Sequence, residues 1–185
     1  MTILFDRVCL IGIGLIGSSL ARAIRQYNLA GQIVCADRSP QHCAKALELG
    51  LVDEAFAEEA EAVRLADLTI LCVPIGAYAS VAAAIGPALK PGSIVTDVGS
   101  VKQAAIRDVA PHIPQGVHFV PGHPIAGTEH SGPEAGFAEL FAGRWAILTP
   151  LPATAPEAVS KVKGLWEAIG SKVEIMEPAH HDRVL

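Results

Sequence analysis

The chain has 185 residues and a formal net charge of −5, and 51% of its residues are hydrophobic while 18% are charged. This length predicts one domain with at most a small appendage. The low share of charge is typical of a parallel sheet that helices cover on both faces. No run of lysine or arginine exceeds a pair, so the composition argues against a polyanion-binding surface and predicts no nucleic-acid partner.

The cysteines and the apolar runs indicate the compartment. Cys9, Cys35, Cys43 and Cys72 form no C-x-x-C pair, so we expect free thiols in a reducing compartment and no metal site. The apolar runs are too short, and too often broken by glycine or proline, to cross a bilayer. The first predicted strand begins so near residue 1 that we expect no signal peptide, and a cytoplasmic protein without a membrane partner.

A glycine motif follows the first predicted strand. Residues 8–11 form an apolar run, and the sequence continues as Gly12-x-Gly14-x-x-Gly17 into a helical pattern over residues 15–27. Gly12 permits a tight turn, Gly14 lets the backbone approach a pyrophosphate, and Gly17 lets helix and strand pack closely. The helix amino terminus offers free N–H groups and a positive dipole end. The pattern predicts a dinucleotide-binding turn, although a glycine-rich turn without a dinucleotide would look the same.

An acidic residue supports the dinucleotide interpretation. A second strand is predicted over residues 32–36, and Asp37 follows it, twenty positions after Gly17. An acid at this distance hydrogen-bonds the ribose 2′-hydroxyl in dinucleotide-binding folds. Asp37 would repel a 2′-phosphate and therefore favours NAD. The adjacent Arg38 could accept that phosphate, so NADP stays open as the alternative.

The rest of the chain alternates between strand and helix patterns, which predicts an α/β fold with a doubly wound, Rossmann-type parallel sheet and extra strands. Capping boxes are predicted at Ser100-x-x-Gln103 and Thr154-x-x-Glu157, and Ser39 is a predicted N-cap. The predicted helices cover residues 39–49, 58–66, 77–88, 101–110 and 154–170, with another starting at 178; the strands cover 68–73, 93–97, 117–120, 145–149 and 172–176; a short strand or turn covers 51–56 and an irregular segment covers 121–137.

The chemistry is expected at the carboxyl edge of this sheet, where ligands bind in open α/β folds. The strand over residues 68–73 should lie beside the first strand, which would bring residues 72–74 near the ribose and nicotinamide of the cofactor. Residues 97–102 and 121–129 leave two further strand ends at the same edge.

Two side chains in these segments are candidates for chemistry. His123 lies between Gly122 and Pro124 just past a strand, where it could take a hydroxyl proton during hydride transfer or simply bond a backbone carbonyl. Lys102 falls in the first turn of a helix, where the dipole disfavours a cation. It is therefore either aimed at an anionic ligand or a solvated lysine.

Three segments carry a more specific pattern. Residues 12–18 read Gly-Ile-Gly-Leu-Ile-Gly-Ser, residues 97–102 read Asp-Val-Gly-Ser-Val-Lys, and residues 122–132 read Gly-His-Pro-Ile-Ala-Gly-Thr-Glu-His-Ser-Gly. Together they resemble the prephenate/arogenate (cyclohexadienyl) dehydrogenases of tyrosine biosynthesis. The third segment is far more specific than the glycine triad, and the resemblance spans almost the whole chain.

This resemblance implies oxidative decarboxylation of prephenate or arogenate, a small-molecule substrate, with hydride transfer to NAD. It implies that His123 is the base at the substrate's 4-hydroxyl and that Ser100 orients this histidine. The predicted cofactor-binding residues are Gly12, Gly14, Leu15, Ile16, Gly17, Asp37, Arg38, Ser39, Cys72, Val73, Pro74 and Gly99, and the predicted substrate-binding residues are Ser100, Lys102, His123, Thr128 and Glu129.

The resemblance also implies a second domain. Members of this family continue into an all-helical domain that closes the substrate pocket and forms a homodimer. We therefore expect a Rossmann domain over residues 1–177, the truncated start of the helical domain over residues 178–185, and an isolated chain that is incomplete for catalysis.

Two other functions remain open at this stage. One is a β-hydroxyacid or imine-type reductase of the same broad fold, which would give no reason for the segment at 122–132. The other is a non-catalytic dinucleotide sensor, which would need no base at His123.

Overall fold

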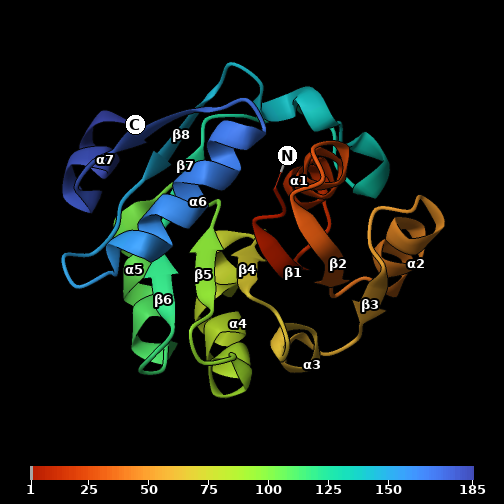
Figure 1. The fold of residues 1–185 in the computed structure, drawn as a ribbon, viewed down its shortest axis with the longest axis horizontal. Coiled ribbons are helices and arrows are strands. Elements are labelled where there is room, and N and C mark those ends of the chain that lie inside the picture. The colour runs from red at the N-terminus through yellow and green to blue at the C-terminus, as the bar shows by residue number, and fades with distance from the viewer. Residues whose placement is uncertain (1) are drawn as a thin grey trace.

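A computed structural model describes residues 2–185, so the first residue of the predicted domain 1–177 lies outside the described residues. Its centre is a six-stranded sheet in the order β3-β2-β1-β4-β5-β6, in which every neighbouring pair is parallel (Figure 1). This order confirms the predicted doubly wound fold, including the place of β4 beside β1. The strands are β1 Phe5–Ile11, β2 Ala30–Ala36, β3 Glu54–Phe56, β4 Leu68–Leu71, β5 Ile94–Asp97 and β6 His118–Val120.

Helices cover both faces of this sheet because successive strand residues point to opposite sides. In β1, Val8 and Leu10 join the core under α1, α2 and α6, whereas Cys9 and Ile11 join the core under α3, α4 and α5. The helices are α1 Leu15–Gln26, α2 Pro40–Glu48, α3 Glu59–Val63, α4 Tyr78–Ile85, α5 Lys102–Val109, α6 Pro156–Ala168 and α7 Pro178–Val184, with short 3₁₀ turns at Ile75–Ala77, Gly86–Ala88, Ala110–His112, Pro133–Ala135 and Ala138–Phe141.

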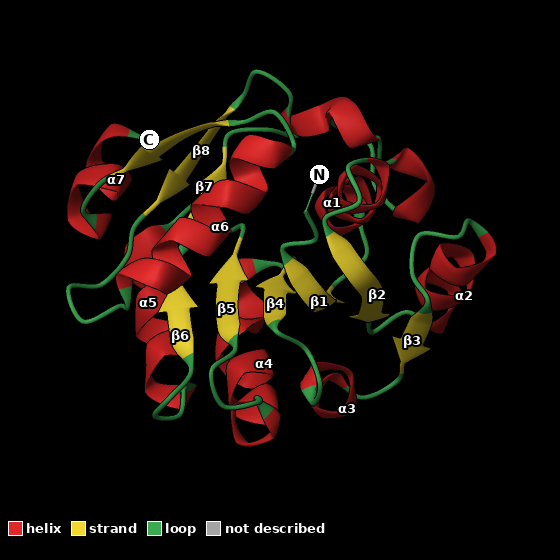
Figure 2. Cartoon of the chain, viewed as in Figure 1, coloured by secondary structure: helices red, strands yellow, loops and turns green. Residues whose placement is uncertain are grey.

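The extra strands form a sheet of their own, which the sequence patterns did not predict. β7 (Gly122–Pro124) pairs antiparallel with β8 (Trp145–Leu148), and β8 pairs parallel with β9 (Lys172–Ile175). Figure 2 shows this sheet above the arrowheads of β5 and β6, beside α7. The start of the predicted irregular segment 121–137 is therefore a strand. Gly-His-Pro has no strand pattern by itself, and only its pairing with β8 makes it one.

One predicted cap forms and one does not. Ser39 accepts a hydrogen bond from the backbone N–H of His42 at 3.2 Å and caps α2 as predicted. The capping box at Thr154 is wrong. The Thr154 hydroxyl donates to the carbonyl of Phe119 at 3.4 Å, and Ala155 is the N-cap residue of α6.

Cys9, Cys35, Cys43 and Cys72 are all free, and Cys9 and Cys35 are buried. Within residues 2–185, no helix combines the length and the apolar character that a bilayer crossing requires.

Close packing of α1 on β1 depends on Gly17. A Cβ atom built at Gly17 would lie 2.2 Å from the carbonyl oxygen of Gly12, which is backbone and cannot rotate away. The helix can therefore approach the strand end only because residue 17 has no side chain.

We predict that Gly17→Ala lowers the free energy of unfolding by about 1–3 kcal/mol, because the added methyl group forces α1 away from the turn. The matched control is Gly164→Ala in α6, where an added Cβ meets nothing within 4 Å. That change should stabilise the protein by up to about 1 kcal/mol. Chemical denaturation of both variants checks this, and equal effects from the two changes would refute the packing role of Gly17.

Candidate active site

The glycine turn forms an open cradle at the amino end of α1. Gly12 has a φ of +93°, in the region that glycine favours, and its own Cβ would lie 2.7 Å from the carbonyl oxygen of Cys72. A Cβ at Gly14, in contrast, would meet nothing within 4 Å. Gly14 is the N-cap residue of α1 and no side chain caps it. The first turn therefore offers free N–H groups to an anion that approaches across Gly14, so these residues fit a dinucleotide pyrophosphate.

Asp37 ties this cradle to the end of β2. Its carboxylate accepts hydrogen bonds from the backbone N–H of Ile13 at 2.9 Å and of Ser39 at 2.8 Å, and only 14% of its side chain is exposed. The neighbouring Arg38 is exposed. The structure thus holds the Asp37 carboxylate directly beside the glycine turn.

The end of β4 lies against the same turn. The backbone N–H of Cys72 donates to the carbonyl of Ile11 at 2.7 Å, and the Cys72 carbonyl faces Gly12. Val73 is half-buried and Pro74 is exposed. The segment at residues 72–74 therefore borders the cradle, as the strand order requires.

A buried carboxylate organises the next strand end. Asp97, the last residue of β5, is fully buried and accepts hydrogen bonds from the Tyr78 hydroxyl at 2.9 Å and from the backbone N–H groups of Gly99 at 2.9 Å and Gly122 at 3.0 Å. It also forms an ion pair with Lys102. Four segments of the chain thus meet at one carboxylate.

Lys102 is not a solvated lysine, which corrects one of the two interpretations of its position. Its side chain is fully buried, and its ammonium group donates to Asp97 and to the carbonyl of Gly122. Burial lowers the pKa of Lys102, and the charge of Asp97 opposes this shift. The ammonium points into the protein and has no exposed surface with which to touch a substrate in this conformation.

His123 lies on β7 and is linked to α7. Its Nδ1 is 2.8 Å from Nε2 of His181, and the two rings meet edge-on with centroids 5.0 Å apart. The other ring nitrogen of His181, Nδ1, is 2.7 Å from Oδ1 of Asp182. His181 is fully buried, whereas His123 is half-buried. The structure therefore places a histidine–histidine–aspartate chain behind the ring of His123.

The predicted capping box at Ser100 does not form. Val101 is the N-cap residue of α5 and has no side-chain cap. Asp182 caps the helix instead, accepting from the backbone N–H groups of Lys102 at 2.7 Å and Gln103 at 2.8 Å. Ser100 is exposed at the strand end. A carboxylate brought from α7 satisfies two orphan donors, so the serine side chain is left free to face the open edge.

Thr128 and Glu129 lie apart from this network. Both are exposed, and the Thr128 hydroxyl accepts from the backbone N–H of His130 at 3.1 Å. The Glu129 side chain is 88% exposed. The described residues do not bring these two side chains against His123.

Sequence reasoning gave no role to Asp97, His181 or Asp182. The adjacent His181 and Asp182 lie in the middle of a short helix, α7, that begins at Pro178, and nothing in their spacing connects them to a histidine on a distant strand. Only Asp97 left a usable signal, an acid at a strand end followed five residues later by a lysine.

The surroundings of His123 lower its pKa to about 4 from an ordinary value of 6.5. Burial is the largest cause, and the electrostatic interactions with His181 and then with Lys102 act in the same direction. The carboxylates of Asp97 and Asp182 oppose them. His123 is therefore neutral, and able to accept a proton, throughout the physiological pH range.

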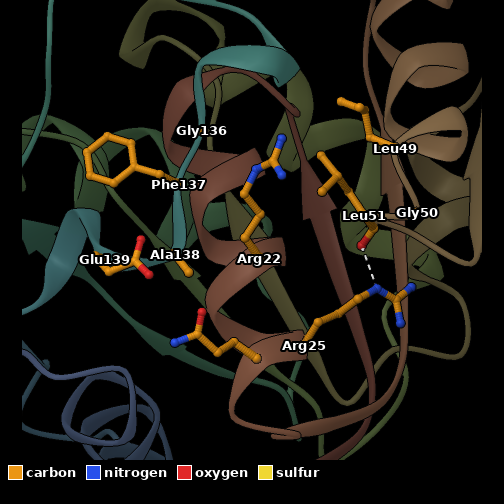
Figure 3. Close-up of a pocket in the computed structure, with 10 residues that line it drawn as sticks. Arg22, Arg25, Leu49, Gly50, Leu51, Gly136, Phe137, Ala138 and Glu139 are labelled. Atoms are coloured by element: carbon orange, nitrogen blue, oxygen red, sulfur yellow. Dashed lines mark hydrogen bonds between the residues drawn. The ribbon is translucent and has the colours of Figure 1, made fainter.

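A cavity elsewhere in the molecule involves other residues. It has a volume of about 580 Å³, and Figure 3 shows Arg22 and Arg25 of α1 beside it. Arg25 donates to the carbonyl of Leu51 at 3.1 Å and pairs with Asp53 at 2.9 Å, while Arg22 donates to the carbonyl of Pro133 at 3.3 Å. Arg25 is thus engaged by the protein itself, whereas the buried Nε of Arg22 has no hydrogen-bond partner among the described residues. Within residues 2–185, no cluster of three or more His, Cys, Asp or Glu residues could hold a metal ion.

Comparison with known protein families gives a match over most of the chain. Residues 20–175 match the family described as prephenate dehydrogenase, nucleotide-binding domain. The cyclohexadienyl dehydrogenase of Zymomonas mobilis is 44% identical over 181 residues, which are 98% of this chain and 61% of that protein.

Solved structures give the same result. A prephenate dehydrogenase from Aquifex aeolicus, in complex with hydroxyphenyl propionate and NAD+, superposes with a TM-score of 0.90 at 34% identity, covering 97% of this chain and 62% of that one. The arogenate dehydrogenase of Synechocystis gives a TM-score of 0.88 at 33% identity, covering 96% and 62%. The chain thus spans about three fifths of the length of these proteins.

We predict that the imidazole of His123 titrates with a midpoint near pH 4. Because its folded-state pKa lies below its unfolded value, the stability tied to neutral His123 is present above about pH 6.5 and is lost as the pH falls toward 4. An NMR titration checks this, with His123→Gln used to assign the resonance. A midpoint above pH 6 would show that the burial and charges described here do not control this ring.

Proposed function

This chain belongs to the prephenate dehydrogenase family, whose nucleotide-binding domain it matches, and we propose that the protein containing it catalyses the NAD-dependent oxidative decarboxylation of prephenate or arogenate in tyrosine biosynthesis. One observation carries the proposal. His123 is anchored at the carboxyl edge of the sheet that also forms the dinucleotide cradle, because the backbone N–H of the preceding Gly122 bonds Asp97 at the end of β5. The relatives named for these substrates support it.

The cofactor side of the site uses residues of β1, β2 and β4. The free N–H groups at the start of α1 would hold the pyrophosphate, and Asp37 would accept hydrogen bonds from the ribose hydroxyls. Residues 72–74, Gly99, Arg38 and Ser39 would border the ribose and nicotinamide. When bound, NAD supplies the acceptor for the hydride that leaves C4 of the substrate ring.

The substrate side centres on His123. As the hydride leaves C4, Nε2 of His123 takes the proton of the 4-hydroxyl, and the C4 oxygen becomes a carbonyl. Loss of the ring carboxylate as CO₂ then returns an electron pair to the ring, which becomes aromatic, and the phenolate oxygen can take the proton back. His123 must therefore be neutral before each turnover, and its lowered pKa keeps it so.

Other residues would position the substrate. Ser100 is exposed three residues after the buried Asp97, and its hydroxyl would reach both the substrate hydroxyl and the nicotinamide. Thr128 and Glu129 would line the pocket once further parts of the protein close over their exposed loop. Lys102 would act on the substrate only through Asp97 and Gly122, since its ammonium group is buried.

We also infer the setting of this domain. The chain spans about three fifths of the length of its relatives, which supports a further domain in the protein. The family resemblance implies that this domain is helical, follows residues 178–185, completes the substrate pocket and forms a homodimer. Four free cysteines support a cytoplasmic protein.

The full-length protein should reduce NAD in the presence of prephenate or arogenate. His123→Asn should lower kcat by roughly 10²–10⁴ and leave the Kd for NAD nearly unchanged, because the base is lost while the cradle is intact. NADH absorbance with each substrate and each cofactor measures this. A loss below tenfold would remove His123 from the role of base, and tight NAD binding without turnover on either substrate would contradict the proposed reaction.

Asp37 should set the choice of cofactor. We expect Asp37→Ala to weaken NAD binding by roughly tenfold or more and to narrow the preference for NAD over NADP, because a charged acceptor for the ribose hydroxyl is lost. Titration of both cofactors against the wild type, Asp37→Ala and Arg38→Ala tests this. If the wild type binds NADP more tightly than NAD, then Arg38 and not Asp37 decides which cofactor binds, and the assignment of NAD is wrong.

A further inference from the structure

We propose that His181 and Asp182 of α7 are positioning residues that hold His123 in the tautomer whose Nε2 can accept a proton. This proposal rests on the proposed function of His123 as a base. It assigns a role to two residues that lie next to each other near the end of the chain and face a strand 58 positions earlier in the sequence.

The ionised carboxylate of Asp182 determines which ring nitrogen of His181 carries the proton. Its two oxygens accept from the backbone N–H groups of Lys102 and Gln103, and these donors hold the pKa of Asp182 below its usual range although partial burial opposes them. An ionised carboxylate can only accept hydrogen bonds. The 2.7 Å contact therefore requires that Nδ1 of His181 carries a proton and donates it to Asp182.

The second step follows from the chemistry of neutral imidazole. With its proton on Nδ1, neutral His181 has only Nε2 as an acceptor. The 2.8 Å contact to His123 then requires Nδ1–H of His123 to be the donor. Neutral His123 is left with a lone pair on Nε2, the nitrogen that none of the described residues bonds. The opposite tautomer would place a proton on Nε2 and block the base.

The same chain of bonds serves the protonated state. When Nε2 of His123 takes a proton, Nδ1–H can still donate to His181, so no hydrogen bond breaks. The Asp182 carboxylate stabilises the resulting positive charge through His181, as a triad aspartate does through its histidine. Here His181 lies between the acid and the base, so two hydrogen bonds replace one. Both still donate toward the Asp182 carboxylate.

The backbone of His123 is held by a separate set of bonds. Gly122 is fixed between Asp97 and Lys102, while the Asp182 carboxylate that orients the rings also caps α5 at Lys102. The ring and the backbone of His123 are thus both anchored through Lys102, the first residue of α5. A shift of α7 would loosen the ring first.

NMR of isotopically labelled imidazole nitrogens tests the tautomer in the full-length protein without reference to catalysis. In the wild type we expect protons on Nδ1 of both His123 and His181. Asp182→Asn keeps an oxygen for the cap of α5, but its amide can donate to His181, so the proton of His123 should move to Nε2. A wild-type proton on Nε2 of His123, a doubly protonated His181, or no change in Asp182→Asn would overturn the proposal.

Kinetics of the full-length enzyme give the second test. Asp182→Asn should lower kcat by roughly 10²-fold or more with KM within about threefold, because the wrong tautomer blocks the base. His181→Gln offers an acceptor where Nε2 lies and should retain at least tenfold more kcat than His181→Leu, which offers none. Equal loss in the two His181 variants would overturn the proposal.

The matched control is His180→Gln, at an exposed neighbour on the same helix, which should stay within about twofold of the wild type. A loss in this control as large as in His181→Leu would count against the proposal, because it would show that α7 is merely unstable. A wild type without dehydrogenase activity would refute the proposed function alone, since the NMR result on the tautomer would still stand.

Discussion

The candidate site depends on one buried ion pair, between Asp97 and Lys102. Two opposite charges with no exposed surface are costly to desolvate, and they persist only where further hydrogen bonds satisfy both groups. Here the carboxylate also accepts from Tyr78, Gly99 and Gly122, and the ammonium also donates to Gly122. Removal of either charge would leave the other buried and unpaired. The pair therefore ties β5, α4, α5 and β7 together where the chemistry is expected.

The two halves of the site are built in different ways. The cofactor half is local, because its cradle is a single turn between β1 and α1 that Asp37 braces from the next strand. The catalytic half is assembled from distant segments, since His123, Lys102 and Asp182 come from one strand, β7, and two helices, α5 and α7. The cofactor half should therefore tolerate changes in α7, whereas the catalytic half should not.

The second sheet explains why the catalytic half needs this bracing. β7 has only three residues, and its partner β8 lies in a sheet separate from the parallel one. So short a strand cannot fix a side chain by its own hydrogen bonds. Gly122, held between Asp97 and Lys102, anchors it to the main sheet, and His181 orients the ring that follows.

The amino-acid sequence by itself determined the strand order of the main sheet and the cofactor cradle, because these follow from short-range patterns. Gly12, Gly14, Gly17 and Asp37 lie within one strand–helix–strand unit, where spacing alone limits the geometry. The tertiary structure alone decided the rest. It made a strand of residues 122–124, replaced the predicted caps at Ser100 and Thr154, buried Lys102, and brought His181 and Asp182 to His123. Apart from the contact of Lys102 with the nearby Asp97, these features depend on partners far along the chain, and no local pattern encodes which partner will arrive.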